Sequence, residues 1–389
     1  MGIRATIFAT VFLVGVTALV SPQSTGDALA RAAAAQPTDL KLSVSERRVG
    51  PGEQFTISAE LKLDADSSPV AGESVQLQWQ RLGVSGWKDG GTATTGGQGR
   101  ATWKQRTPES RRYRAVYDGT ATFAASVSGV SKVTMKPVVT AKASRDWVRP
   151  DGTVTVRARV SPAYRAEFVT LQERDGGHWS DVKRKRQDAH GRASFTVGGR
   201  GQYGPQRYRV VLDRRDDHLG AQSSSVEVST VRLVTYVIET RGKVRGALPA
   251  FRSRTAEIYA DPRGWSRADV HFKRVKSGGA FSLVLSQAKY VPSFGSPCDR
   301  YWSCRVGRYV IINENRWRHG TPYFKSAGGT LRQYRAMVVD HETGHWFGLD
   351  HATCGGKGQL APVMMQQSKG LYGCKPNAWP LPSEIARAF

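Results

Sequence analysis

The stretch TLRQYRAMVVDHETGHWFGLDHATC, residues 330–354, holds three of the chain's eight histidines within eleven residues. Before the histidines, apolar residues such as Tyr334 and Val338 recur three or four positions apart, which is the period of an amphipathic helix. Gly348 then breaks the pattern, because glycine accepts the left-handed backbone angles with which many helices end. The stretch therefore predicts a helix over residues 330–348.

The histidines within this helix have the spacing of metal ligands. His341 and His345 are four residues apart and share one helix face, and a turn at Gly348 can bring His351 back towards them. Three imidazoles suit tetrahedral zinc with its fourth position open to water. Glu342 follows the first histidine, beside the pair but outside the ligand set. We predict a zinc site, the alternative being a polar helix whose histidines bind nothing.

The full pattern, H-E-x-x-H-x-x-G-x-x-H, resembles the signature of the metzincin metallopeptidases. The resemblance implies an α+β catalytic domain in which His341, His345 and His351 hold Zn²⁺ and Glu342 is the catalytic general base towards a zinc-activated water. It also implies a Met-turn, which we assign to Met364 in APVMMQQ rather than to the next methionine. Metzincin substrates lie extended along an edge strand, for which RYVIINENRW, residues 308–317, is the candidate.

A closer resemblance covers residues 232–389. The segments CDRYWSCRVGRYVIINENRW, HETGHWFGLDH and APVMMQQSKGLYGCKPNAWP are similar to an exported metzincin-like family of high-GC Gram-positive bacteria, a domain of unknown function. Two glutamines stand where some metzincins have an oxyanion-stabilising tyrosine, and we do not expect the nearest one, Tyr372, to replace it. Asp340 and Asp350 flank ligands, and we interpret them as solvated helix-end residues rather than partners of the ligands.

All four cysteines lie in the C-terminal part of the chain. An even number in an exported protein indicates two disulfides. We favour Cys298–Cys304 and Cys354–Cys374, because each pair closes a short loop, while the crossed pairings remain open. No CxxC spacing supports a four-cysteine zinc site.

The N-terminus has the layout of a secretory signal peptide, residues 1–35. An arginine precedes an apolar run from Ala5 to Val20, and small residues follow, with cleavage after Ala30 or Ala35. An uncleaved membrane anchor is the alternative, although the run is short for a span. We expect no transmembrane span in the mature chain.

Two stretches ahead of the histidine helix resemble each other at a spacing of about a hundred residues. Segments of alternating apolar and polar residues, separated by turns, predict two Ig-like β-sandwiches at residues 38–136 and 137–231. We expect their aromatic residues to be core residues rather than a sugar-binding platform, and their role to be that of a spacer or an envelope-binding module. Equivalent positions are Trp87 and Trp179, Gly99 and Gly191, and Tyr113 and Tyr208.

The formal charge of +25 is spread along the chain without a nucleic-acid-binding motif. It therefore favours an anionic cell envelope or acidic partners over a specific nucleic acid.

The sequence predicts a multidomain protein: two all-β Ig-like sandwiches followed by an α+β metzincin-like domain, residues 232–389. We expect a secreted or envelope-associated monomeric zinc metallopeptidase that hydrolyses peptide bonds in extracellular proteins, envelope proteins or peptidoglycan stem peptides. One alternative is a cell-envelope-binding protein whose zinc site is idle or structural. Another is an adhesin-like basic binder that needs no zinc.

Overall fold

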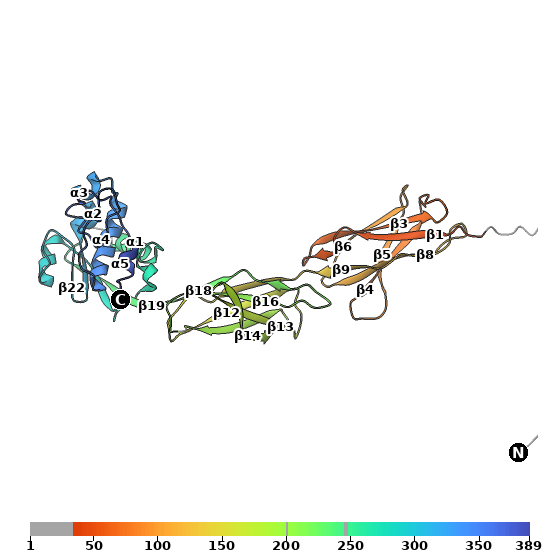
Figure 1. Cartoon of the computed structure of the whole chain (residues 1–389), viewed down its shortest axis with the longest axis horizontal. Coiled ribbons are helices and arrows are strands. Elements are labelled where there is room, and N and C mark those ends of the chain that lie inside the picture. The colour runs from red at the N-terminus through yellow and green to blue at the C-terminus, as the bar shows by residue number, and fades with distance from the viewer. Residues whose placement is uncertain (1–33, 200, 245–247) are drawn as a thin grey trace, which may run out of the picture.

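The computed structural model describes residues 34–199, 201–244 and 248–389, which form three bodies in a row (Figure 1). All but the last two positions of the predicted signal peptide lie outside these residues. Within the described part of the chain, no helix is long and apolar enough to cross a membrane.

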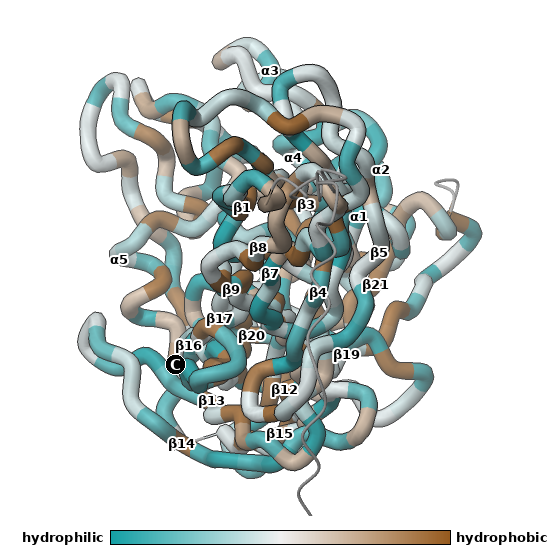
Figure 2. Tube along the Cα trace, turned by 90° about the vertical axis from the view of Figure 1, so that its right-hand side faces the viewer, coloured by the Kyte–Doolittle hydropathy of each residue, from teal (hydrophilic) through white to brown (hydrophobic). Residues whose placement is uncertain are grey.

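The first body is a β-sandwich built from the first half of the repeat. One sheet has the order β1-β3-β6, and the other has the order β2-β9-β7-β4-β5 with β8 beside β7. Burial alternates along β3, and hydrophobic and hydrophilic residues are interspersed along the chain, as the short brown and teal stretches of Figure 2 show. The strands are β1 Thr38–Val44, β2 Arg48–Val49, β3 Gln54–Leu63, β4 Ser74–Arg81, β5 Lys88–Thr94, β6 Arg100–Arg106, β7 Arg111–Tyr117, β8 Ser126–Val127 and β9 Ser131–Met135.

The second body repeats this architecture. Its sheets have the orders β10-β12-β15 and β11-β18-β16-β13-β14, with β17 beside β16. The strands are β10 Val138–Ala143, β11 Trp147–Val148, β12 Thr153–Ser161, β13 Phe168–Asp175, β14 His178–Arg186, β15 Arg192–Gly198, β16 Gly204–Leu212, β17 Ala221–Gln222 and β18 Val226–Thr230.

The equivalent glycines and tyrosines of the repeat have matching roles. Gly99 and Gly191 have φ of +68° and +73°, and at each a Cβ would collide with a backbone carbonyl oxygen of the strand opposite. Only glycine fits such a turn without strain. Tyr113 and Tyr208 are buried in the two sandwich cores, as expected.

The equivalent tryptophans do not belong to those cores, contrary to our expectation. Trp87 and Trp179 are only half-buried. The guanidinium carbon of Arg114 lies 4.4 Å from the Trp87 ring centroid, and that of Arg209 lies 4.4 Å from the Trp179 ring centroid. Each half-buried indole therefore packs against an arginine side chain through a cation–π contact.

The third body combines one mixed sheet with helices. The sheet has the order β20-β19-β21-β23-β22. Its strands are β19 Arg232–Arg241, β20 Val270–Arg274, β21 Phe281–Ser286, β22 Cys304–Val306 and β23 Tyr309–Asn313. The helices are α1 Leu248–Ala260, η1 Trp265–Ala268, η2 Ala288–Phe294, α2 Glu314–His319, α3 Pro322–Ser326, α4 Leu331–Trp346 and α5 Pro382–Ile385.

The edge strand beside the site differs from the one that we predicted. Strand β23, within RYVIINENRW, lies between its parallel neighbour β21 and its antiparallel neighbour β22. A tight turn at Gly307 folds β22 back onto β23, so β22 becomes the edge. Asn313 then ends β23 and caps α2 with its side chain, so the last residues of the segment are helical.

Helix α4 is the predicted histidine helix. Thr330 and Gln333 form a capping box at its start, which satisfies backbone N–H groups that have no partner within the helix. Its apolar face, including Tyr334 and Val338, joins one core with the sheet strands. The helix ends at Trp346, and Gly348 has φ of +89°, as the turn towards His351 requires.

Short connections join the three bodies. Only two residues, Lys136 and Pro137, separate β9 from β10, and only Val231 separates β18 from β19. At the second joint the Trp147 and His271 rings stack with centroids 4.3 Å apart.

Candidate metal centre

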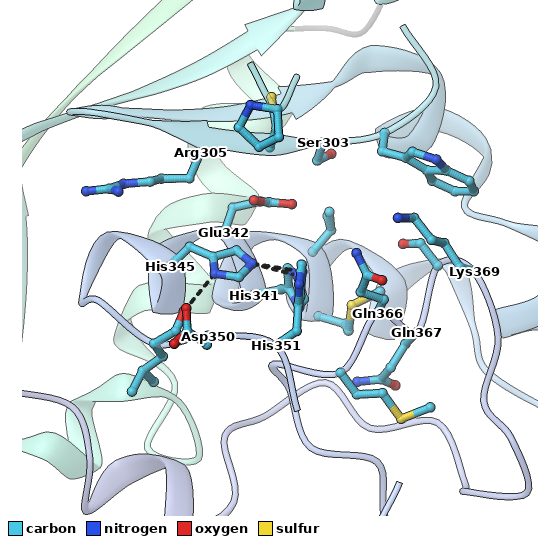
Figure 3. A pocket seen from close by; sticks show the side chains of 18 of the residues that line it. Ser303, Arg305, His341, Glu342, His345, Asp350, His351, Gln366, Gln367 and Lys369 are labelled. Carbon is cyan, nitrogen blue, oxygen red and sulfur yellow. Dashed lines mark hydrogen bonds between the residues drawn. The ribbon is translucent and has the colours of Figure 1, made fainter. Parts of the chain in front are cut away.

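The three predicted histidine ligands come together above α4 (Figure 3). The Nε2 atom of His345 lies 3.2 Å from Nε2 of His341 and 3.2 Å from Nε2 of His351. Ligands on a tetrahedral zinc ion, each bonded at about 2.0–2.1 Å, stand roughly 3.3 Å apart. The spacing of the three nitrogens therefore fits one shared ion.

The opposite ring nitrogens fix the tautomers of two of these histidines. Nδ1 of His341 lies 2.8 Å from the Val363 carbonyl oxygen, and Nδ1 of His345 lies 2.7 Å from the Leu349 carbonyl oxygen. A carbonyl only accepts, so each Nδ1 carries the hydrogen and each Nε2 presents a lone pair. Burial also lowers the pKa of His341 to about 3, which keeps the ring neutral. Converging lone pairs repel one another unless a cation lies between them, so the donor set fits zinc.

The peptide that carries the Val363 carbonyl is held in place by a carboxylate that the sequence did not indicate. Glu384, at the C-terminal end of the chain, is buried and accepts hydrogen bonds from the backbone N–H groups of Val363, at 3.0 Å, and Met364, at 2.7 Å. It also accepts from Leu381 at 2.7 Å. The Val363 peptide is thus held on one side by Glu384 and on the other by His341. No sequence pattern around Glu384 indicates this role.

Glu342 faces the same space as the histidine nitrogens. Its side chain is buried, and burial raises its pKa to about 8, while the nearby Lys369 opposes this shift. A divalent cation at the histidines would favour the carboxylate and lower that pKa. The carboxyl group of Glu342 therefore lies in the same cavity as the three histidines.

Met364 packs beneath the helix between the first two ligands. A Cβ added at Gly344 would collide with the Met364 sulfur and the Trp265 ring, so only glycine permits this approach. Met364 is fully buried in the main core, whereas Met365 lines the pocket above. The order of helix, turn and methionine is the one expected for Met364.

Three further residues of the third body, Tyr372, Asp350 and Asp340, lie in different environments. Tyr372 is 80% exposed and does not line the pocket, so it is not an oxyanion donor here. Asp350 is exposed, as expected. Asp340 is instead fully buried, contrary to our interpretation, because α4 packs that face against Trp265. Burial raises the pKa of Asp340 well above its usual range, and its carboxyl oxygens have no hydrogen-bond partner among the described residues.

The triad opens into a cavity of about 370 Å³. One wall comes from Pro297 to Arg305, the floor from α4, and the other wall from Met365 to Lys369. The disulfides Cys298–Cys304 and Cys354–Cys374 both form, as favoured from the sequence, and tie the segments that carry these walls.

A second histidine group lies where the two sandwiches meet. His218 is fully buried, with Nδ1 2.8 Å from the Leu219 carbonyl oxygen and Nε2 3.0 Å from a Glu167 carboxylate oxygen. Both ring nitrogens already face protein oxygens, so this arrangement ties the joint together and does not present a free ligand nitrogen.

Comparisons with known proteins add little about chemistry. A comparison with curated proteins found no match. Among solved structures, the chain is similar to the D0-D1 domain of Intimin (15% identity, 49% of this chain, 98% of that chain, TM-score 0.20). It is also similar to the adhesin InvE of Yersinia pseudotuberculosis (11% identity, 50% of this chain, 59% of that chain, TM-score 0.28). Residues 206–379, which include the whole histidine triad, match the family model "Protein of unknown function (DUF3152)".

Proposed function

We propose that residues 232–389 form a zinc-dependent metallopeptidase that hydrolyses peptide bonds. The main support is that three imidazole Nε2 atoms converge beside the buried carboxyl group of Glu342. In two of these rings, the Nδ1 atom is held by a backbone carbonyl oxygen. A structural zinc site usually closes its fourth position with a protein ligand. Here all three histidines line a cavity in which a substrate would bind.

Each residue has a chemical role in this proposal. His341, His345 and His351 would hold the ion, which when bound supplies a Lewis acid that lowers the pKa of water towards about 7 and polarises a carbonyl group. Glu342 would accept a proton from the attacking water at a carboxylate oxygen and then deliver it to the leaving amine. The exposed side of β22 would align an extended peptide, since edge strands offer unpaired backbone groups.

The two disulfides support an oxidising location for this activity, outside the cytoplasm. Together with the predicted signal peptide, they favour a secreted or envelope-associated peptidase. The monomeric state is part of the same proposal.

The replacement Glu342→Gln tests the proposal. We expect the full-length variant to retain about one zinc per chain and to lose peptide cleavage by at least about a hundredfold, because an amide cannot accept the proton. Zinc content by mass spectrometry and chelator-sensitive cleavage of a diverse peptide library are the measurements. Glu257→Gln, the same replacement at an exposed position of α1 that does not line the cavity, is the matched control and should cleave as the wild type does.

The rival proposal is an envelope-binding protein with an idle zinc site. Zinc binding without cleavage of any peptide by the wild type would favour that rival. Absence of zinc binding would contradict both.

A further inference from the structure

Two cations line the cavity, one in each of its two walls. Arg305 lies on the edge strand β22, and Lys369 lies on the loop that follows the two methionines (Figure 3). A substrate of the proposed peptidase that binds in this cavity would therefore lie beside two positive groups.

Neither cation is neutralised by the protein. Within the described ranges, no carboxylate forms an ion pair with Arg305 or Lys369. The Nε atom of Arg305 is buried and has no hydrogen-bond partner there. A buried donor without an acceptor costs free energy, and a substrate carboxylate would supply an acceptor.

Lys369 is held at the cavity by an aromatic ring rather than by an anion. Its Nζ lies 5.8 Å from the centroid of the Trp302 ring, and the Arg316 guanidinium carbon lies 4.6 Å from the same ring. Trp302 lines the cavity as well. The ring contact keeps the ammonium near the wall while leaving its hydrogen-bond donors available.

The acidic residue on the same wall does not serve these cations. One oxygen of Asp299 accepts the backbone N–H groups of Tyr301, at 2.7 Å, and Trp302, at 3.0 Å, which shapes the loop within the disulfide Cys298–Cys304. A zinc ion at the histidines would add two further positive charges. Glu342 and Asp350 also line the cavity, so the positive groups would outnumber the negative ones by one charge, which a neutral peptide leaves uncompensated and an acidic peptide compensates.

We propose that the site selects acidic peptides, with substrate carboxylates bound by Arg305 on one side of the scissile bond and by Lys369 on the other. This inference rests on the proposed function and assigns its substrate class. The planar fork of Arg305 suits bidentate binding of a carboxylate, whereas Lys369 acts as a point charge.

The test measures binding separately from cleavage. Zinc-loaded Glu342→Gln protein is titrated with fluorescent peptides of equal length that carry glutamate, glutamine or lysine on both sides of the central bond. We expect the glutamate peptide to bind about tenfold or more tightly than the glutamine peptide. Adding Arg305→Gln or Lys369→Gln should remove most of that difference without changing zinc content.

Two further protein variants test whether the preference depends on these two positions. Arg318→Gln removes an equal charge from an exposed position on α2 that does not line the cavity, and it should leave the preference intact. The double replacement Arg305→Glu with Lys369→Glu should shift the preference to the lysine peptide.

The outcomes separate this inference from the proposed function. Equal binding of the glutamate and glutamine peptides, or an unchanged preference in both single variants, would overturn the selection of acidic peptides even if the wild type cleaves peptides. If the wild type cleaves nothing while the glutamate preference depends on both cations, the charge assignment stands and the peptidase proposal fails.

Discussion

At the scale of single residues, the proposed zinc site depends on groups outside the histidine triad. The Val363 carbonyl orients His341, and the buried carboxylate of Glu384 holds the same peptide unit through the N–H group of Met364. Ligand histidines bind metal well when their other nitrogen is fixed, because the ring then loses little freedom on binding. Glu384 is therefore a positioning residue for a ligand that lies more than forty positions earlier in the chain.

We predict that Glu384→Gln weakens zinc binding by about tenfold. The amide keeps the size of the side chain but replaces one acceptor oxygen with a donor, so the N–H groups of Val363 and Met364 can no longer both be satisfied. Competition with a chromogenic chelator measures the affinity. Ser383→Ala, an exposed neighbour on α5, is the control, and equal affinities of the two variants would contradict the role of Glu384.

At the scale of elements, helix α4 forms the floor of the site and two loop segments form its walls. Helix α4 supplies two ligands and Glu342 in fixed register, whereas His351 and Met364 come from the segments beyond it. The bond Cys354–Cys374 joins a residue three positions after the third ligand to the end of the methionine loop, with a sequence separation of 20. It restricts how far these two segments can separate.

We predict that the double replacement Cys354→Ser with Cys374→Ser destabilises the C-terminal body by about 3 kcal/mol, since an open loop of this length gains entropy on unfolding. Zinc should also dissociate faster, because His351 is no longer tied to the loop. Calorimetry and stopped-flow release to a chelator are the measurements. The matching change at Cys298 and Cys304, which closes a loop with a separation of 6, should cost less.

The parts of the site that could be predicted from the sequence are the local ones. The period of α4 puts His341 and His345 on one face, and Gly348 allows His351 to return, because these relations depend on neighbouring residues. The order of strands in a sheet depends on distant pairing, so the edge position of β22 was not foreseen. Burial of Asp340 also depends on distant packing, here against Trp265.

At the scale of the whole molecule, the joints decide how the three bodies work together. The second joint combines a one-residue connection at Val231 with the ring stack of Trp147 and His271. Burial in this stack lowers the pKa of His271, and Lys273 acts in the same direction, while Asp146 opposes them. The packed joint therefore prefers the neutral imidazole.

We predict that this joint loosens as the pH falls below the ordinary histidine value of 6.5. The unpacked state then binds a proton that the packed state resists, so the contribution of the stack is present above that pH and is lost below it. Hydrogen exchange at Val231, whose N–H bonds to the Val148 carbonyl oxygen at 2.8 Å, measures the opening. His271→Phe keeps a stacked ring without a titrating proton, and its exchange should lose this pH dependence. An equal response in that variant would contradict the prediction.

The brevity of the two connections has a mechanical consequence. A flexible linker lets an attached domain sample a wide volume, whereas connections of one and two residues allow little relative movement of the bodies. On the proposed function, a target bound by the first sandwich would stay at a nearly constant distance from the histidine triad. Removing one sandwich would then move the position of cleavage closer to the bound end of the target.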